Sequence, residues 1–239
     1  MKTIGLLGGM TWHSSGRYYQ LINEGVAERL GPFRSAKIVL HSVDYGELRR
    51  SRADGDWRRL GRQLGAAARG LQKAGADGIF VCSNTIHNLL PAIQARCSLP
   101  VLHICDAVAD ALEEQMIDEV GLLGTAFTVR QPFYIDRLRD RGLRVHVNDP
   151  ETVDSLHHII MHELARGQVT TDSRLRFAEA IEGLQESGAR AIILGCTEIG
   201  MIVDPKNVDI PVIDSTVAHA NAAISWALDE GETRRATKQ

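Results

Sequence analysis

The sequence predicts an α/β fold of two pseudo-symmetric parallel-sheet lobes, with the active site in the cleft between them. Three observations support this prediction. Short apolar runs rich in β-branched residues alternate with longer amphipathic segments. Three sequence blocks recur in the same order in the two halves of the chain. Two of the apolar runs end in similar clusters of thiol, hydroxyl and amide side chains.

The predicted strands are short and mostly apolar on both faces. In chain order they cover Thr3–Leu7, Ala36–His41, Gly78–Val81, Val101–Ile104, Val120–Leu123, Leu143–Val147, Ala191–Leu194 and Val212–Ile213. Apolar residues at three- and four-residue steps predict helices over Trp57–Lys73, Phe133–Arg141 and Ser173–Glu186. Apolar strands separated by helices indicate parallel sheets built from βαβ units. The polar segment Asp229–Gln239 is expected to fray.

The internal repeat predicts how the chain is divided. The aligned blocks are Gly5–Ile22 with Gly121–Leu138, Leu71–Asn88 with Leu184–Met201, and Leu99–Ala111 with Ile210–Ala222. We therefore expect two copies of one α/β unit related by a pseudo-twofold axis. The N-terminal lobe would comprise residues 1–99, completed by the returning segment 208–239, and the C-terminal lobe residues 100–207. A duplication alone does not indicate a function.

The composition is that of an ordinary globular protein. Of the 239 residues, 44% are hydrophobic and 24% charged, and the net charge of −3 gives no reason to expect nucleic acid or a membrane as a partner. No apolar run reaches the roughly 18 residues of a membrane span, and the start MKTIGLLGGM lacks the features of a signal peptide. The four cysteines show neither CxxC spacing nor disulfide density, so a cytoplasmic location is expected.

Each polar cluster directly follows a predicted buried strand. The repeat places Ser83, not Cys82, opposite Cys196. Because side chains alternate between the two faces of a strand, a shift of one residue would turn Cys82 away from the site that Ser83 faces. Parallel α/β sheets bind ligands beyond the carboxyl ends of their strands. Two proton-handling groups facing each other across a bound carbon are what stereoinversion requires.

The motifs GLLGGM, HSVDYGEL, CSNT, GLLGT and GCTE resemble the aspartate/glutamate racemase superfamily over nearly the whole chain. The resemblance implies a homodimeric racemase that binds a small acidic amino acid and uses no pyridoxal phosphate, other cofactor or metal. In that family the first cluster reads Cys-Asn-Thr, and its cysteine and the cysteine of Gly-Cys-Thr-Glu are the two bases. Here Ser83 replaces the first cysteine. This departure is similar to a subgroup with threonine at that position, which prefers L-aspartate and L-glutamate.

The resemblance implies that Cys196 acts on the L-enantiomer. Cys196 is expected to open a helix, whose dipole and free N–H groups would lower its pKa. Asn84, Thr85, Thr197 and Glu198 fit two interpretations. They could cap helices, or the hydroxyl, amide and N–H groups could hold substrate carboxylates while Glu198 holds the ammonium. The remaining cysteines are interpreted as small buried residues.

The loop Gly8-Gly9-Met10-Thr11 has neither the GxGxxG order nor a P-loop pattern, so no nucleotide site is expected. The resemblance implies instead that the backbone around Met10, with Thr125 and Thr128 in the matching loop, contacts a substrate carboxylate. It also places a side-chain carboxylate contact near Arg52, a role that suits a bidentate guanidinium. The other arginines of this region are interpreted as a solvated helix face.

Four further residues are weighed and not assigned to the site. His158 and His162 share a predicted helix face, but HHIIMHE is not the HExxH motif and no third ligand lies nearby in the sequence. No metal site is therefore predicted. Asp44 and His87 fit either a supporting role beside the site or a purely structural role.

The predicted function is interconversion of L- and D-aspartate or glutamate by proton transfer at Cα. Ionising a thiol at pH 7 costs about 2 kcal/mol and a serine hydroxyl roughly 12 kcal/mol, so Ser83 is expected to donate a proton rather than act as a resting base. Two alternatives remain: one-cysteine chemistry of the hydantoin racemase, maleate isomerase or malonate decarboxylase type, and a silent protein that only binds an acidic amino acid. Glu198 favours an amino acid, because its carboxylate suits an ammonium.

Overall fold

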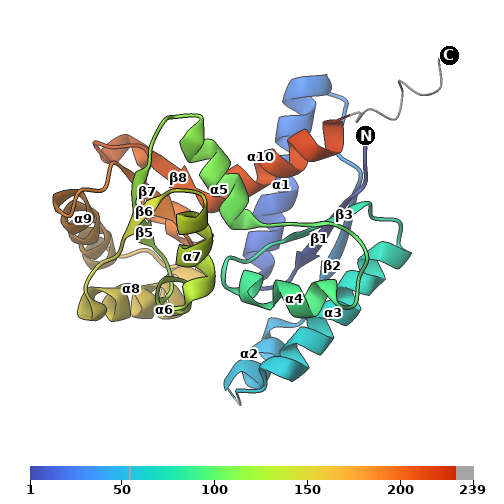
Figure 1. Ribbon diagram of the computed structural model, residues 1–239, viewed down its shortest axis with the longest axis horizontal. Coiled ribbons are helices and arrows are strands. Elements are labelled where there is room, and N and C mark those ends of the chain that lie inside the picture. Colours follow the sequence, from blue (N-terminus) through green and yellow to red (C-terminus); the bar gives the residue numbers. More distant parts are fainter. Residues whose placement is uncertain (54, 230–239) are drawn as a thin grey trace. The chain divides into compact units, whose positions relative to one another are not determined.

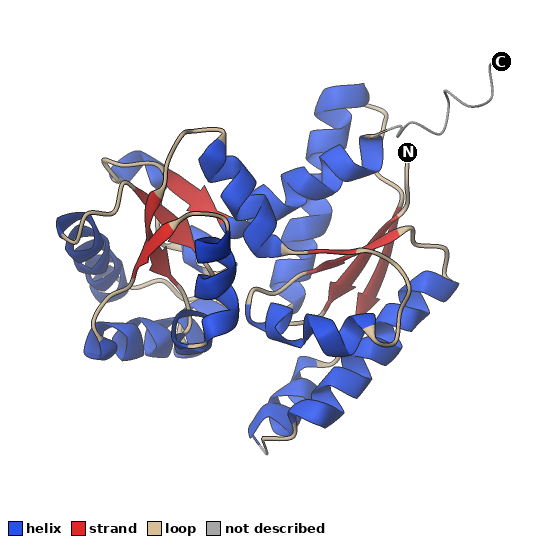
Figure 2. Cartoon of the chain, viewed as in Figure 1, coloured by secondary structure: helices blue, strands red, loops and turns tan. Residues whose placement is uncertain are grey.

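The computed structural model describes residues 1–53 and 55–229, with their side chains except those of residues 52 and 53. It contains two four-stranded sheets, and every strand pair in them is parallel (Figures 1 and 2). The order β2-β1-β3-β4 is built from β1 (Ile4–Gly8), β2 (Ile38–Ser42), β3 (Gly78–Val81) and β4 (Val101–Leu102). The order β6-β5-β7-β8 is built from β5 (Glu119–Leu123), β6 (Arg144–His146), β7 (Ala191–Leu194) and β8 (Val212–Asp214). The α/β class and the eight predicted strands are confirmed.

Helices connect the strands in both halves. The α-helices are α1 (Trp12–Leu30), α2 (Tyr45–Ala53), α3 (Trp57–Lys73), α4 (Leu90–Gln94), α5 (Ile104–Glu113), α6 (Ala126–Arg130), α7 (Pro132–Asp140), α8 (Pro150–His162), α9 (Thr171–Glu186) and α10 (Ser215–Leu228). The short 3-10 helices are η1 (Thr85–Leu89), η2 (Leu164–Arg166), η3 (Ile199–Met201) and η4 (Pro205–Asn207). Within the described residues, no helix combines the length and the apolar character needed to cross a bilayer. The predicted fraying covers Asp229–Gln239, of which residues 230–239 lie outside the described part.

The repeat is visible in the register of the strands. In the first sheet, Gly5 of β1 lies opposite Ile79 of β3, and in the second sheet Gly121 of β5 lies opposite Ile192 of β7. These are the positions that the sequence alignment pairs. Because the third and fourth strands of each sheet also pair at equivalent positions, the two sheets share one topology and one register.

The core of the first unit lies where α1 and the later part of α10 cover one face of the sheet. It comprises Ile4, Leu6, Tyr18, Ile22, Val26, Phe80, Cys82, Ala220, Ala223, Ile224 and Ala227. The buried hydroxyl of Tyr18 joins it through a 2.9 Å hydrogen bond to Nδ1 of His219. Cys82 is wholly enclosed, and its burial raises the pKa of the thiol. Cys82 is therefore part of the packing, as predicted, whereas Ser83 next to it is partly exposed.

The second unit has a layer of helices on each face of its sheet. On one face, residues of α5 and α7 pack against β5, β7 and β8 (Figure 1). On the other face, residues of α8 and α9 pack against β5 and β7. The strands are thus buried on both sides, which explains why their sequences are continuously apolar.

The boundary between the units differs from the predicted one. The first unit comprises Met1–Cys82, Leu89–Leu102 and the residues from His219 onward, and the second comprises Ser83–Asn88 and His103–Ala218. The returning segment was expected to leave the second lobe at residue 208. Instead, β8 forms a ladder with β7, so the chain joins the first unit only after the first turn of α10. Backbone hydrogen bonding between strands, which the repeat alone did not resolve, sets this boundary.

Side-chain caps define the first turns of α5 and α10. Nδ1 of His103 accepts the N–H of Cys105 at 3.1 Å, and Oδ1 of Asp214 accepts the N–H of Thr216 at 2.8 Å. His103 and Asp214 are equivalent in the repeat. The predicted strand over Val101–Ile104 is therefore too long, because His103 already caps a helix. Burial is the main cause that lowers the pKa of His103 to about 2, and its neighbours His87 and Arg137 lower it further.

Candidate functional site

Two polar loops follow neighbouring strands of the second unit. Thr125 and Thr128 come after β5, and Cys196, Thr197 and Glu198 come after β7. In the order β6-β5-β7-β8, β5 and β7 flank the point at which the direction of the connections reverses. Parallel α/β sheets bind their ligands at the carboxyl ends of the strands at this switch point. This end of the second sheet is therefore the candidate site.

A glycine lets the end of β7 approach β5 closely. The N–H of Gly195 donates to the carbonyl oxygen of Leu123 at 2.7 Å. A Cβ atom at Gly195 would lie 2.9 Å from that same oxygen and 2.9 Å from Cδ1 of Leu122. Both separations are shorter than real contacts of this kind, so only glycine fits without displacing the backbone. Cys196 follows directly and is fixed by this approach.

Cys196 and Glu198 form a hydrogen-bonded pair. The thiol of Cys196 donates to Oε2 of Glu198 at 3.1 Å, and the hydroxyl of Thr197 donates to the same oxygen at 2.5 Å. All three residues are partly exposed. A thiol and a carboxylate in contact form a unit that can exchange a proton, which is the requirement for acid–base chemistry at a bound carbon.

The ionisation of Cys196 differs from the sequence prediction. Its pKa is raised well above the ordinary value, first by burial of the thiol and then by the negative charge of Glu198. The predicted lowering depended on a helix beginning at Cys196. The structure has only the three-residue 3-10 helix η3 after Glu198, so no long array of aligned peptide dipoles points at the thiol. The resting form is therefore the thiol, with its proton directed at the carboxylate.

Three predicted binding residues come together through their hydroxyl groups. Thr85 Oγ1 lies 3.1 Å from Thr128 Oγ1, which in turn lies 3.3 Å from Thr125 Oγ1. Thr128 is completely buried, and Thr125 is nearly so. Thr125 is the residue before α6, but its side chain does not cap that helix. The hydroxyl of Thr125 therefore stays with those of Thr85 and Thr128, and together the three can contribute to an anion site.

Asn84 is linked to a residue that the sequence reasoning missed. Nδ2 of Asn84 donates to Oγ of Ser215 at 3.1 Å, and Oγ of Ser215 donates to the carbonyl oxygen of Leu194 at 2.7 Å. Oδ1 of Asn84 is buried and has no hydrogen-bond partner among the described residues. An acceptor in this state suits an N–H donor such as an ammonium, whereas a carboxylate, the predicted contact, offers no donor. The available signal for Ser215 was a polar residue opposite the apolar Ile104 in the repeat.

The backbone of the Ser83 turn is held by a buried histidine. Nδ1 of His87 lies 2.8 Å from the carbonyl oxygen of Ser83, and Nε2 lies 3.2 Å from the N–H of Ile104. A carbonyl only accepts and a backbone N–H only donates, so Nδ1 carries the proton and the ring is neutral. His87 therefore supports the turn. Within the described residues, Oγ of Ser83 makes no hydrogen bond, so no base is placed to activate it.

The predicted residues of the first unit are placed only within that unit. Met10 is buried in the loop between β1 and α1. Arg52 lies on α2, and its side chain is outside the described part of the structure. Asp44 accepts the N–H of Gly46 at 2.7 Å ahead of α2, which is a structural role. The assignments of Met10 and Arg52 to the substrate remain predictions.

His158 and His162 stack on one face of α8, with ring centroids 4.4 Å apart. Across the described ranges, no three His, Cys, Asp or Glu side chains gather in a way that could hold a metal ion. Within those ranges the pair has no third ligand.

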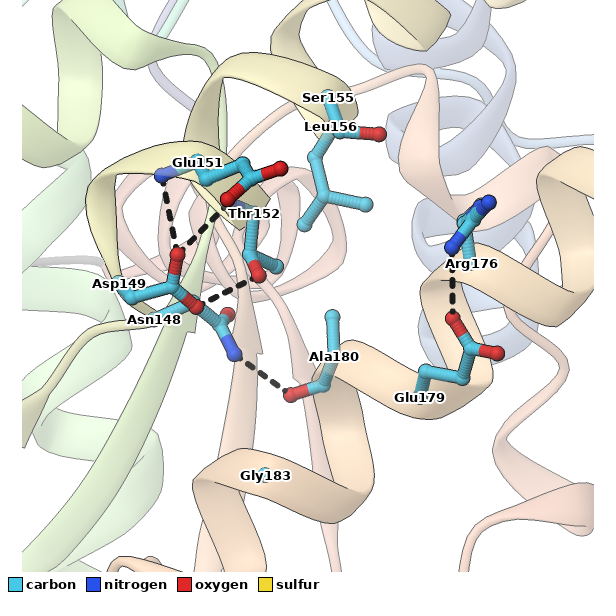
Figure 3. Close-up of a pocket in the computed structure, with 10 residues that line it drawn as sticks. All are labelled: Asn148, Asp149, Glu151, Thr152, Ser155, Leu156, Arg176, Glu179, Ala180 and Gly183. Carbon is cyan, nitrogen blue, oxygen red and sulfur yellow. Dashed lines mark hydrogen bonds and ion pairs between the residues drawn. The ribbon is translucent and has the colours of Figure 1, made fainter.

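A surface cavity of about 570 Å³ lies between the start of α8 and α9 (Figure 3). Its charged groups serve the fold. Asp149 accepts the hydroxyl of Thr152 at 2.6 Å and the N–H groups of Thr152 and Glu151, and these bonds lower its pKa; Arg176 pairs with Glu179 at 3.3 Å. The described lining contains none of the predicted site residues, and we do not assign a function to it.

Comparisons with known proteins identify the family of the chain. The family model described as Asp/Glu/Hydantoin racemase matches residues 7–223. A candidate Asp/Glu racemase from Yersinia pestis is 43% identical, with a TM-score of 0.90 over 95% of this chain and 100% of that one. An aspartate racemase homologue from Pyrococcus horikoshii OT3 is 30% identical, with a TM-score of 0.84 over 95% and 99% of the two chains. The broad specificity amino-acid racemase RacX of Bacillus subtilis (strain 168) is 25% identical over 78% of this chain and 75% of that protein. A glutamate racemase of Shewanella sp. (strain MR-7) matches over 53% of this chain and 45% of its own length.

Proposed function

Because the chain belongs to the Asp/Glu/hydantoin racemase family, we propose that it racemises aspartate or glutamate by proton transfer at Cα without a cofactor. The observation that carries this proposal is the contact of the Cys196 thiol with the Glu198 carboxylate beyond β7. Cys196 is the base that removes the Cα proton of the L-enantiomer, and Ser83 is the donor on the other side.

The substrate itself makes Cys196 a stronger acid. The carboxylate of Glu198 is one cause of the raised pKa of Cys196. A substrate ammonium beside Glu198 offsets that negative charge, so binding lowers the pKa of the thiol toward its ordinary value. Glu198 stays a carboxylate paired with the ammonium, the thiol proton is released to water, and the thiolate forms more readily when a substrate is bound.

The remaining groups fit the two ends of an amino acid. The linked hydroxyls of Thr85, Thr125 and Thr128 supply donors for a carboxylate. The acceptor Oδ1 of Asn84 receives an N–H of the ammonium, together with Glu198. Donors aimed at the carboxylate also stabilise the negative charge that spreads onto it when the Cα proton leaves.

The test is proton NMR in D2O with each enantiomer of aspartate and glutamate. We expect the wild-type protein to exchange the Cα proton of one L-substrate for deuterium, and Cys196→Ala to abolish that exchange. Cys97→Ala is the matched control, because the Cys97 thiol also donates to a side-chain oxygen, Oε1 of Gln72 at 3.3 Å, but in the first unit. Exchange by a folded Cys196→Ala protein would refute the assignment. Binding without exchange by wild type would indicate the silent binding protein, and decarboxylation or isomerisation of other acids would indicate one-cysteine chemistry.

A further inference from the structure

A buried serine joins the two polar clusters of the candidate site. Ser215 is the first residue of α10, and its side chain is fully buried. Its hydroxyl contacts Asn84, beside Ser83, and Leu194, two residues before Cys196. One oxygen atom thus connects the turn that carries one predicted catalytic residue with the strand end that carries the other.

The direction of both hydrogen bonds follows from the chemistry of the partners. The carbonyl oxygen of Leu194 can only accept, so the single proton of the Ser215 hydroxyl points at Leu194. The contact with Asn84 must then use a lone pair of Ser215, which requires an N–H donor. Nδ2 of Asn84 therefore faces Ser215, and Oδ1 faces away from it. The terminal amide of an asparagine can turn by about 180° with little change in the energy of the side chain itself. The hydrogen bond to Ser215 therefore decides which of the two amide orientations Asn84 adopts.

Capping of α10 does not account for the serine. Asp214 already accepts the N–H groups of Thr216 and Val217 at the start of the helix. The position equivalent to Ser215 in the first half of the repeat is Ile104, which contacts the same turn through its backbone N–H and His87. The first residues of two equivalent helices thus hold the segment Ser83–Asn88, one through a backbone group and the other through a side chain.

We propose that Ser215 is a positioning residue of the racemase site. It fixes the amide of Asn84 so that Oδ1 is presented to the substrate ammonium, and it fixes the end of β7 behind Cys196. This inference rests on the proposed function. Ser215 itself touches neither the substrate nor the transferred proton.

The test compares Ser215→Ala with Ser215→Thr and Thr216→Val. Alanine removes both hydrogen bonds and leaves a buried amide unpaired, so kcat/KM for the L-substrate should fall about ten- to hundredfold, mostly through KM. Threonine keeps the hydroxyl and should restore activity to within a few-fold. Thr216 is the matched control, because it is equally buried and its hydroxyl has no partner among the described residues. Thr216→Val should behave as wild type.

A double-mutant cycle with Asn84→Ala separates positioning from a general loss of packing. If Ser215 acts through Asn84, the double variant should be no worse than Asn84→Ala alone by more than a few-fold. Fully multiplied losses of kcat/KM would overturn the proposal, as would wild-type KM in Ser215→Ala.

The rate at which iodoacetamide modifies Cys196 tests Ser215 without any substrate. Ser215→Ala should change this rate several-fold because it releases the end of β7, whereas Thr216→Val should not. If wild type exchanges no Cα proton, the proposed function fails, and the alkylation rates then decide on Ser215 alone. Equal rates in all three proteins would overturn the positioning role.

Discussion

Glu198→Gln should make Cys196 more acidic while making the protein a poorer racemase. In the structure Oε2 of Glu198 lies 3.1 Å from the thiol sulfur. A thiolate at that distance from a carboxylate is disfavoured by about 1 kcal/mol at the dielectric constant of water and by about 5 kcal/mol at an effective value near 20. At the lower of these energies, replacing the carboxylate by a neutral group changes the fraction of thiolate about tenfold. Because the pair is partly exposed, we expect the lower half of this range.

The sign of the effect follows from the charge. The negative charge of Glu198 opposes formation of the negative thiolate, so a neutral glutamine should lower the pKa of Cys196 and speed alkylation at any pH below the wild-type pKa. The assay is the rate of iodoacetamide modification of the Cys196 peptide, followed by mass spectrometry from pH 6 to 10. We expect the midpoint of this pH profile to lie lower in Glu198→Gln than in wild type.

Glu179→Gln is the matched control for Glu198→Gln. It makes the same change in net charge within the second unit but removes only an exposed pair with Arg176. An unchanged or higher midpoint in Glu198→Gln would refute the electrostatic argument, and an equal fall in Glu179→Gln would reduce it to an effect of net charge. Racemisation should fall in Glu198→Gln despite the extra thiolate, because the ammonium loses its carboxylate partner. Faster racemisation would show that Glu198 does not bind the ammonium.

Three further predictions concern catalysis and stability. Ser83→Cys should raise net racemisation, and Ser83→Ala should lower it while sparing deuterium exchange from the L-substrate. Circular dichroism and NMR on the same samples measure inversion and exchange. Inversion by Ser83→Ala at the wild-type rate would show that Ser83 takes no part in the reaction. Because the folded protein holds His103 unprotonated down to a pKa of about 2, stability is greatest above pH 6.5 and declines as the pH falls below it, by about 2 kcal/mol between pH 7.5 and pH 5. His103→Asn keeps a capping side chain and should remove this part of the pH dependence in urea unfolding, and an unchanged dependence would contradict the argument. Gly195→Ala should cost about 1–3 kcal/mol of unfolding free energy, because its Cβ would overlap the carbonyl oxygen of Leu123. Gly124→Ala should cost less, because the nearest atom to its Cβ would lie 3.4 Å away. Equal losses of Tm in the two variants would contradict this argument.

The strands were predictable because burial on both faces leaves a mark in the local sequence. The apolar runs Gly78–Val81 and Ala191–Leu194 coincide with β3 and β7 residue for residue. The repeat then predicted which strands correspond, and the paired registers agree with it. In a parallel sheet the carboxyl ends of neighbouring strands share one edge, so the loops that contain Thr125 and Cys196 follow the same edge of the second sheet.

Some of the chemistry at the site could not be predicted in this way. The sequence suggested a low pKa for Cys196, but a 3-10 helix follows in place of an α-helix, and Glu198 turns its carboxylate back to the thiol. Both outcomes depend on how a few residues turn after β7. The pattern of apolar residues does not record that turn. The homodimer implied by the family and the cytoplasmic location expected from the cysteines remain predictions.

The sequence by itself determined the α/β class, the eight strands, the duplication and the two polar clusters. These features depend on residue spacing along one chain segment, or on likeness between two segments. Only the tertiary structure decided that the chain rejoins the first unit at His219, and that Asn84 turns its amide to a serine 131 residues away. Such choices depend on which donor meets which acceptor once the elements have packed. That pairing is a property of three-dimensional proximity, and no periodicity in the sequence encodes it.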